Sequence, residues 1–191
     1  MRTEITRSIR QLVDLTESEI SEFTEVAKIK AYEVNSNFIK AGQIPKKLGF
    51  VLSGLFRYVY LSEDGKEFTK VFMPERSFIS SYSAMISRTP SYFFIEAIEN
   101  SEVLEIPFYS WQSLLKTNPK WNGLLIKLLE KGYTTKEKRE REFLLLDAEN
   151  RYRIFLDEYK DLEGRVKQHM IASYLGITPI ALSRIRKKMS E

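Results

Sequence analysis

Residues 166–189 read VKQHMIASYLGITPIALSRIRKKM, and this stretch determines how the C-terminal part of the chain folds. Ala172 is small, as is needed where two helices cross closely, and Gly176 follows four residues later at a turn that favours positive φ. Thr178 is a candidate cap for the next helix, and Pro179 suits the first turn of that helix. This spacing predicts a helix-turn-helix motif.

The second helix of the motif carries an excess of basic side chains on its outer face. Residues 165–191 contain six basic side chains and one acidic side chain, whereas residues 1–115 have a net charge of −2. A basic face without compensating acids is what contacts with DNA phosphates require. The alternative is a helical hairpin with a solvated basic end. We expect double-stranded DNA as a partner, bound by Thr178, Pro179, Ile180, Ser183, Arg184, Lys187 and Lys188.

A long helix is predicted before this motif. Asn118 is a candidate N-cap and Pro119 a candidate first-turn residue, and the helical pattern continues to about Leu146. Shorter helices are expected at 109–115 and 150–159. The long helix begins with an apolar stripe, which either forms a seam with a second copy or packs only on its own chain. The stripe consists of Trp121, Leu124, Leu125, Leu128 and Leu129.

Alternating apolar and polar residues predict short strands between residues 28 and 108. Turn signals separate these runs, and Asp64-Gly65 is a typical hairpin signal. The pattern favours an all-β barrel or roll. Residues 3–27 are predicted to be helical, with Thr16 as a candidate N-cap. The alternating runs lie at 28–32, 50–60, 68–72, 92–97 and 102–107.

Composition excludes several classes of function. The chain has no cysteine, which rules out disulfides, Cys-ligated zinc, iron–sulfur clusters and thiol nucleophiles. His169 is the single histidine and is expected at the surface, so we expect no cofactor, no metal site and no enzymatic activity. The first residues lack the apolar run of a signal peptide, and no uninterrupted apolar stretch is long enough to span a bilayer. We therefore expect a cytoplasmic protein that does not contact membranes.

A β-roll followed by a long helix and a C-terminal helix-turn-helix resembles the CRP/FNR family of bacterial transcription regulators. The resemblance covers nearly the full length and is carried by FVLSG at 50–54, EDGKE at 63–67, PERSFI at 74–79, EVLEIP at 102–107 and the segment 166–189. It implies an α+β chain with an N-terminal double-stranded β-helix or jelly-roll of the cyclic-nucleotide-binding type. A long dimerisation helix and a C-terminal, winged-helix-like helix-turn-helix domain complete the implied fold.

The same resemblance implies a homodimer that binds DNA and senses an effector. The implied boundaries are 1–117 for the effector-sensing roll with its N-terminal helix, 118–146 for the dimerisation helix and 147–191 for the DNA-binding domain. The apolar stripe from Trp121 to Leu129 is then the expected dimer seam. Because the sequence ends at Glu191, we expect no wing hairpin after the second helix of the motif.

The family's cyclic-nucleotide cassette is altered in this chain. Relatives that bind cyclic nucleotides have Gly-Glu after a Phe-Ile pair, for the ribose, and Arg-Ser about ten residues later, for the phosphate. Here Ser80-Ser81 follow Phe78-Ile79, and Ser91-Tyr92 take the Arg-Ser positions. We therefore expect that cyclic AMP is not bound by the usual contacts. Arg88 is a candidate replacement. Tyr82, Tyr92, Phe93 and Phe94 are bulkier than a phosphate site requires, and we interpret them as filling the core or the pocket. An unknown small-molecule effector is expected near Ser80, Ser81, Tyr82, Arg88, Ser91 and Tyr92.

The helix expected to read DNA also departs from the family. Relatives that read guanine-rich half-sites have Arg and Glu at its first two exposed positions and a second Arg four residues after the Glu. Here Pro179 and Ile180 take those positions, and only Arg184 matches. An apolar side chain contacts a thymine methyl group but makes no hydrogen bond to a base. Arg184 is predicted to contact either a guanine or a phosphate. The alternative function is a sensor or scaffold module that keeps the roll and the long helix without reading DNA.

Overall fold

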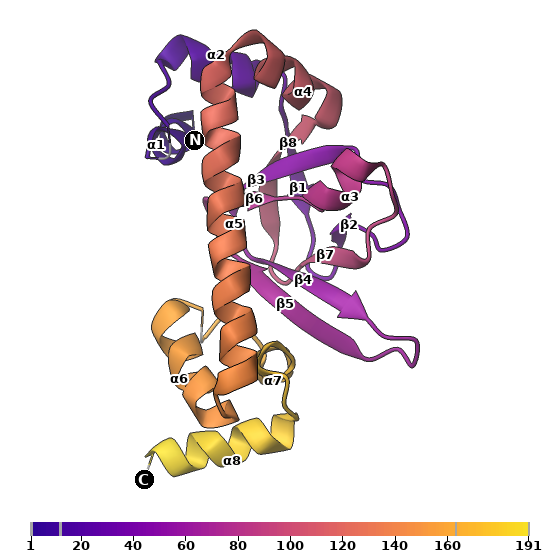
Figure 1. Cartoon of the computed structure of the whole chain (residues 1–191), viewed down its shortest axis with the longest axis vertical. Helices are drawn as coiled ribbons and strands as arrows, with labels where there is room; N and C mark the ends of the chain where they lie inside the picture. The colour runs from indigo at the N-terminus through magenta and orange to yellow at the C-terminus, as the bar shows by residue number, and fades with distance from the viewer. Residues whose placement is uncertain (1, 12, 163, 191) are drawn as a thin grey trace. The chain divides into compact units, whose positions relative to one another are not determined.

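A computed structural model describes residues 2–11, 13–162 and 164–190, and these form the α+β fold that the sequence predicts. The chain divides into two compact units (Figure 1). The first unit comprises Met1–Val59 and Phe72–Lys131, and the second comprises Tyr60–Val71 and Gly132–Glu191. The long helix α5 (Pro119–Leu145) contributes its first half to one unit and its second half to the other.

The predicted roll consists of two four-stranded sheets. One sheet has the order β1 (Lys28–Tyr32), β8 (Ser101–Pro107), β3 (Lys47–Ser53) and β6 (Phe78–Ile79). The other has the order β2 (Asn37–Ile39), β7 (Phe93–Ala97), β4 (Phe56–Leu61) and β5 (Glu67–Met73). Strand β8 pairs antiparallel with both β1 and β3, so the EVLEIP string lies at the centre of its sheet.

Gly54 makes the turn between β3 and β4, and this position requires glycine. Its φ is +90°, and an added Cβ would lie 2.1 Å from the Ser101 hydroxyl oxygen. The Gly54 N–H donates to the Glu75 carboxylate at 3.0 Å. Gly65 lies in the predicted hairpin between β4 and β5 with a φ of +80°, so the turn signal of Asp64-Gly65 is confirmed.

Helices cover the first sheet and complete the core of the first unit. Phe23 stacks on Trp121 with ring centroids 5.3 Å apart, and its edge contacts Trp111 at 6.4 Å. All three rings are fully buried, as is Leu124. The helices that supply these residues are α2 (Glu17–Glu25), α4 (Phe108–Thr117) and the first half of α5.

The N-terminal segment differs from the prediction of one helical stretch over 3–27. It forms two helices, α1 (Arg2–Arg10) and α2, because Thr16 caps the second one as predicted. The Thr16 hydroxyl accepts from the Glu19 N–H at 3.3 Å, and the Glu19 carboxylate accepts in return from the Thr16 N–H at 2.7 Å. This capping box needs extended backbone at Thr16 and so ends any continuous helix there.

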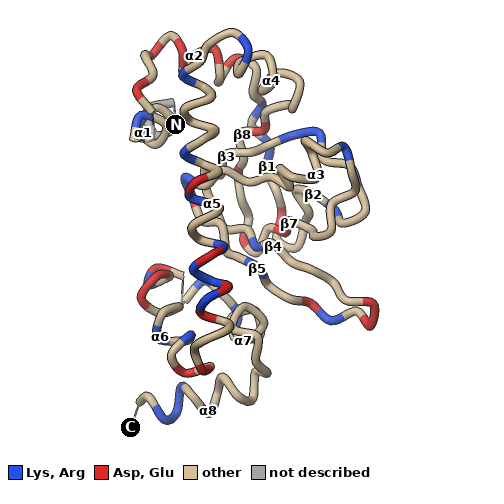
Figure 2. The backbone as a smooth tube through the Cα atoms, viewed as in Figure 1, with Lys and Arg blue, Asp and Glu red and all other residues tan. Residues whose placement is uncertain are grey.

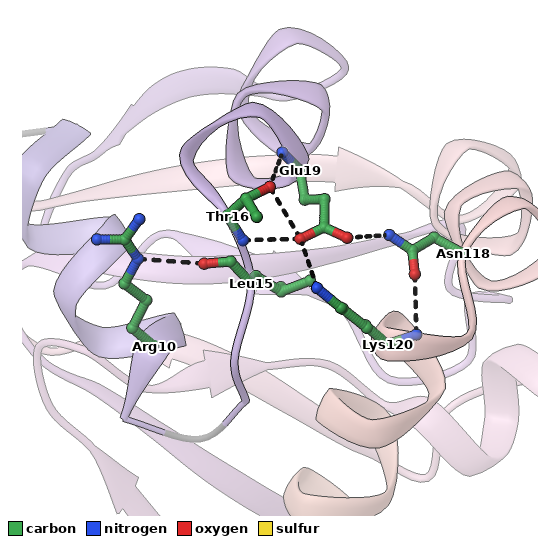
Figure 3. A network of polar contacts seen from close by, with 6 residues as sticks. All are labelled: Arg10, Leu15, Thr16, Glu19, Asn118 and Lys120. Carbon is green, nitrogen blue, oxygen red and sulfur yellow. Dashed lines mark hydrogen bonds and ion pairs between the residues drawn. The ribbon is translucent and has the colours of Figure 1, made fainter.

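The Glu19 carboxylate also connects α2 to the start of α5 through polar contacts (Figure 3). It accepts from the Asn118 side-chain amide at 2.7 Å and from the Lys120 ammonium at 3.2 Å. The Asn118 side-chain carbonyl accepts from the Lys120 N–H at 3.0 Å, which confirms Asn118 as the N-cap of the long helix. The Thr16 backbone N–H is the main cause that lowers the pKa of Glu19 to about 2.

Three short elements were not expected from the sequence. Strand β2 has three residues and β6 has two, and both lie outside the runs whose alternation is visible. Helix α3 (Tyr82–Ser87) ends at Arg88, which has a φ of +54°. The second unit contains α6 (Ala148–Glu158), α7 (Gln168–Leu175) and α8 (Pro179–Ser190). In the described part of the chain, no helix combines the length and hydropathy needed to cross a membrane.

Candidate nucleic-acid interface and effector site

Helices α7 and α8 form the predicted helix-turn-helix. Gly176 ends α7 with φ 70° and ψ 30°, in the left-handed region, and the Ile177 N–H donates to the Ala172 carbonyl at 3.0 Å. This closing bond is typical of a helix that ends at glycine. An added Cβ at Gly176 would lie 2.8 Å from Cε1 of Phe143, so backbone conformation and space both require glycine.

Helix α8 begins and packs as its sequence predicts. The Thr178 hydroxyl oxygen accepts from the Ala181 N–H at 3.2 Å, and Pro179 is the first residue of the helix. Leu182 is fully buried, and Ile185 is half-buried on the same side. Because Leu182 and Ile185 face the interior of the unit, the opposite side of α8 faces solvent.

All seven predicted DNA-contacting residues are exposed. Ile180 exposes 68% of its surface. Helix α8 contains four basic side chains and no acidic one (Figure 2). The structure thus places a basic, solvent-facing helix at the position that the motif predicts.

The Lys188 ammonium is neutralised within the unit, which the sequence did not indicate. It lies 2.6 Å from a carboxylate oxygen of Glu149, at the start of α6. Glu149 also pairs with Arg153 at 2.9 Å, and these cations lower the pKa of the Glu149 carboxyl, with Lys188 as the main cause. Lys188 therefore already has an acidic partner within its own unit.

The hairpin of residues 60–71 contacts α7, and no sequence pattern predicted this. The Ser173 hydroxyl donates to the Glu67 carbonyl at 2.9 Å and accepts from the Thr69 N–H at 2.8 Å. The Arg139 guanidinium lies 3.6 Å from the centroid of the Tyr174 ring and donates to the carbonyl of the same residue. Contacts across about a hundred residues carry no local signal, so only the folded chain shows them.

The predicted effector residues separate into a buried group and an exposed group. Ser81 and Ser91 are buried, and their hydroxyl oxygens lie 2.9 Å apart. The Tyr58 hydroxyl accepts from the Ser80 N–H at 2.8 Å and donates to the Ser80 carbonyl at 3.2 Å, and burial raises the pKa of Tyr58. These polar groups are thus hydrogen-bonded to one another within the roll.

The other three predicted effector residues do not join this group. Tyr82 is half-buried against the core of the first unit. Arg88 is exposed at the end of α3, and Tyr92 exposes 84% of its surface. The interpretation of Tyr92 as core or pocket filler is therefore wrong, because the ring faces solvent.

The predicted dimer seam is corrected at two positions. Trp121 and Leu124 have no accessible surface, because they fill the core of the first unit, and they offer nothing to a second copy. Leu125 and Leu128 are half-buried against the same core, and Leu129 exposes 48% of its surface. Exposed apolar residues along α5 that the stripe did not include are Ile126, Tyr133, Phe143, Leu144 and Leu145.

No metal site is present among the described residues. No group of three or more His, Asp or Glu side chains lies close enough there to hold a metal ion. His169 is exposed at the start of α7, as expected.

In a comparison with models of known protein families, the roll matches one of them. Residues 29–118 match the model of the cyclic nucleotide-binding domain. This stretch is thus similar to cyclic nucleotide-binding domains. The match begins in β1 and ends at the N-cap of α5, so it covers the roll together with α3 and α4. The comparison with curated protein sequences found no match.

Solved structures of CRP/FNR regulators share the fold of the cyclic nucleotide-binding domain and of the helices that follow it. The c-di-GMP-responsive global regulator CLP of Xanthomonas campestris matches with a TM-score of 0.76 at 17% identity, over 92% of each chain. FixK2 of Bradyrhizobium japonicum matches with a TM-score of 0.77 at 18% identity, over 86% of this chain and 85% of its own. A protein of Eubacterium rectale assigned to the CRP/FNR family matches with a TM-score of 0.73 at 17% identity, over 93% and 84%. The CRP/FNR fold expected from the sequence is confirmed.

Proposed function

We propose that the chain is a homodimeric transcription regulator that binds double-stranded DNA through α8 and senses an effector through its β-roll. The observation that supports this most strongly is the geometry at Gly176, which presents α8 as an exposed helix with four basic and no acidic side chains. The likeness to CRP/FNR regulators supports the same reading. The proposed parts are the sensor domain over 1–117, the dimerisation helix over 118–146 and the DNA-binding domain over 147–191.

Arg184 is the residue of α8 best suited to read a base. It is exposed, its fork of donors matches the two acceptors of guanine, and no described carboxylate pairs with it. A preferred duplex is first selected from random DNA with the purified protein. Arg184→Ala should then weaken binding to that duplex by about 1–3 kcal/mol and relax the preference at one base position. The matched control is Lys116→Ala, an exposed lysine on α4. Unchanged affinity together with unchanged preference would show that Arg184 reads no base.

A sensor or scaffold without DNA reading is the second candidate function. Pro179 and Ile180 favour it, because neither side chain makes a hydrogen bond to a base edge. The same selection experiment separates the two candidates. A regulator enriches a defined sequence over successive rounds, whereas a scaffold enriches none.

The sensor domain is proposed to respond to a molecule other than cyclic AMP. Ser81 and Ser91 lie at the cassette positions, and their hydroxyls are hydrogen-bonded to each other. Arg88 is exposed. A neutral hydroxyl pair gives none of the charge-assisted contacts that a cyclic phosphate needs. Titration calorimetry should show no heat of saturable binding with cyclic AMP. Saturable submicromolar binding would contradict this part of the proposal.

Dimerisation is proposed to use the exposed apolar residues of α5. Ile126 and Leu129 expose 54% and 48% of their surfaces, so they are available to a second copy. The double variant Ile126→Glu/Leu129→Glu should sediment as a monomer, because charges at a buried interface are costly. Gln112→Glu, at an exposed position of α4, is the matched control and should sediment like the unchanged chain. A dimer that persists in the double variant rejects this surface.

A further inference from the structure

The first unit contains a cavity that lies outside the predicted effector cassette. Its volume is about 340 Å³, which is within the range of roughly 300–1,000 Å³ typical of small-molecule sites. It lies between the β2–β3 connection and the ends of β1 and β8. Lys28, Lys46 and Lys47 line it together with the apolar residues Phe38, Ile39 and Ile44. We call it the lysine-rimmed pocket.

The charge of Lys47 is already satisfied inside the protein. Its ammonium lies 2.6 Å from the Glu105 carboxylate and 2.8 Å from the Tyr32 hydroxyl, and it lies 4.5 Å from the centroid of the Phe38 ring. The Tyr32 hydroxyl also donates to Glu105. Each polar group of this network therefore has a partner, and Lys47 and Glu105 form one wall of the pocket.

Lys28 and Lys46 give the pocket an uncompensated positive charge. Both are exposed, and neither forms an ion pair with a carboxylate of the described residues. Glu105 is the one carboxylate among the lining residues, and it forms an ion pair with Lys47. Two free ammonium groups at the rim of a concave site raise the local concentration of small anions.

The inner surface of the pocket is apolar. Phe38 and Ile39 are buried in the sheet, Pro45 and Pro107 add further carbon surface, and Ile44 exposes 47% of its surface. An inorganic ion gains nothing from these groups, whereas an organic anion buries its hydrocarbon part against them. We propose that the lysine-rimmed pocket binds a small organic anion, with its acid group at Lys28 and Lys46 and its apolar body on Phe38, Ile39 and Ile44.

The pocket wall is joined to the cassette by backbone hydrogen bonds. The Gly42 N–H donates to the Ser91 carbonyl at 2.8 Å, and the Ser91 N–H donates to the Gln43 carbonyl at 2.9 Å. An anion that orders the β2–β3 connection thus acts on Ser91 as well. Binding at this pocket does not depend on the proposed DNA binding, and its test needs no DNA.

The test uses a charged probe and its neutral analogue. 8-Anilinonaphthalene-1-sulfonate is an aromatic anion that fluoresces when it binds apolar surface, and N-phenyl-1-naphthylamine is the same ring system without the sulfonate. The full chain should bind the sulfonate saturably with one site per chain. Lys28→Glu/Lys46→Glu should weaken the affinity for the sulfonate by roughly tenfold or more and leave the affinity for the neutral analogue unchanged. Both substitutions are at exposed positions, but Lys28 lies opposite Glu105 in the pairing of β1 with β8, so circular dichroism is recorded to verify that the fold is kept.

The control variant Gln112→Glu/Lys116→Glu lowers the net charge by three at exposed positions of α4, against four in Lys28→Glu/Lys46→Glu, and it should bind the sulfonate like the unchanged chain. Displacement of the sulfonate by benzoate or by phenyl phosphate supports the pocket and identifies the preferred acid group. Four results would overturn the proposal: no saturable binding, an equal loss of affinity in the control variant, an affinity for the sulfonate that Lys28→Glu/Lys46→Glu leaves unchanged, and displacement by neither competitor.

Discussion

The turn at Gly176 sets the orientation of α8 on α7, and the substitution Gly176→Ala tests it. Two effects are expected to lower the free energy of unfolding. An L-residue with a side chain is strained at a φ of +70°, by about 1–2 kcal/mol. The new Cβ also lies 2.8 Å from Cε1 of Phe143, and overpacking of this kind costs about 1–3 kcal/mol. Because Phe143 is 41% exposed, its ring can shift to relieve part of the overlap, so we expect a total destabilisation in the lower part of the summed range, about 2–4 kcal/mol.

Gly65→Ala isolates the first of these costs. Gly65 has a φ of +80°, and an added Cβ meets no atom within 4 Å, so only backbone strain of about 1–2 kcal/mol remains. Urea denaturation followed by circular dichroism measures both variants and Gly176→Ala in a Phe143→Leu background. We expect the cost of Gly176→Ala to fall toward that of Gly65→Ala when the ring is removed. Equal costs for the two glycine variants in the unchanged background would refute the close approach of Phe143.

Three further predictions concern the cap, the basic helix and the hairpin. The pKa of Glu19 falls from its ordinary value of 4.5 to about 2 on folding, so its stabilisation is present above 4.5 and is lost as the pH falls toward 2. Denaturation at pH 7, 5 and 3 should therefore show that the difference in free energy of unfolding between the unchanged chain and Glu19→Gln becomes smaller as the pH falls. A difference that stays constant would contradict the cap network. Lys187→Ala should weaken binding to a random duplex more than Lys188→Ala, because Glu149 already pairs with Lys188, and fluorescence anisotropy that ranks them the other way would reject this. Ser173→Ala removes two hydrogen bonds to the hairpin and should cost about 1–3 kcal/mol in urea denaturation, whereas a loss indistinguishable from zero would show that the bonds do not form in solution.

The elements with a strong periodic or capping signal were predictable from the sequence. Thr16, Asn118 and Thr178 each accept the backbone hydrogen bond expected of a helix cap. Gly65 and Gly176 have the positive φ that their turns require. In each case the signal is local, since the residue acts on backbone groups within a few positions of itself.

The remaining features depend on contacts that are distant in the sequence. An apolar stripe shows that one face of a helix is covered, but it does not show what covers it, and Trp121 and Leu124 are covered by their own chain. Tyr92 lies just before β7, although the alternating run was predicted to begin with it, and Ser81 and Ser91 pair across α3 from positions ten residues apart. The lysine-rimmed pocket combines residues from four strands and the β2–β3 connection, so no motif in the sequence indicates it.

The salt dependence of DNA binding tests the central proposal most directly. Affinity for a random duplex is measured by fluorescence anisotropy between roughly 50 and 200 mM salt, where each neutralised phosphate contributes about 0.9 to the slope of log affinity against log salt. We predict a steep linear decrease for the unchanged chain and a slope smaller by about one to two for Arg184→Ala/Lys187→Ala, with no change for Lys116→Ala. The absence of binding, or a slope that the double variant leaves unchanged, would contradict the assignment of α8 as the DNA-binding helix.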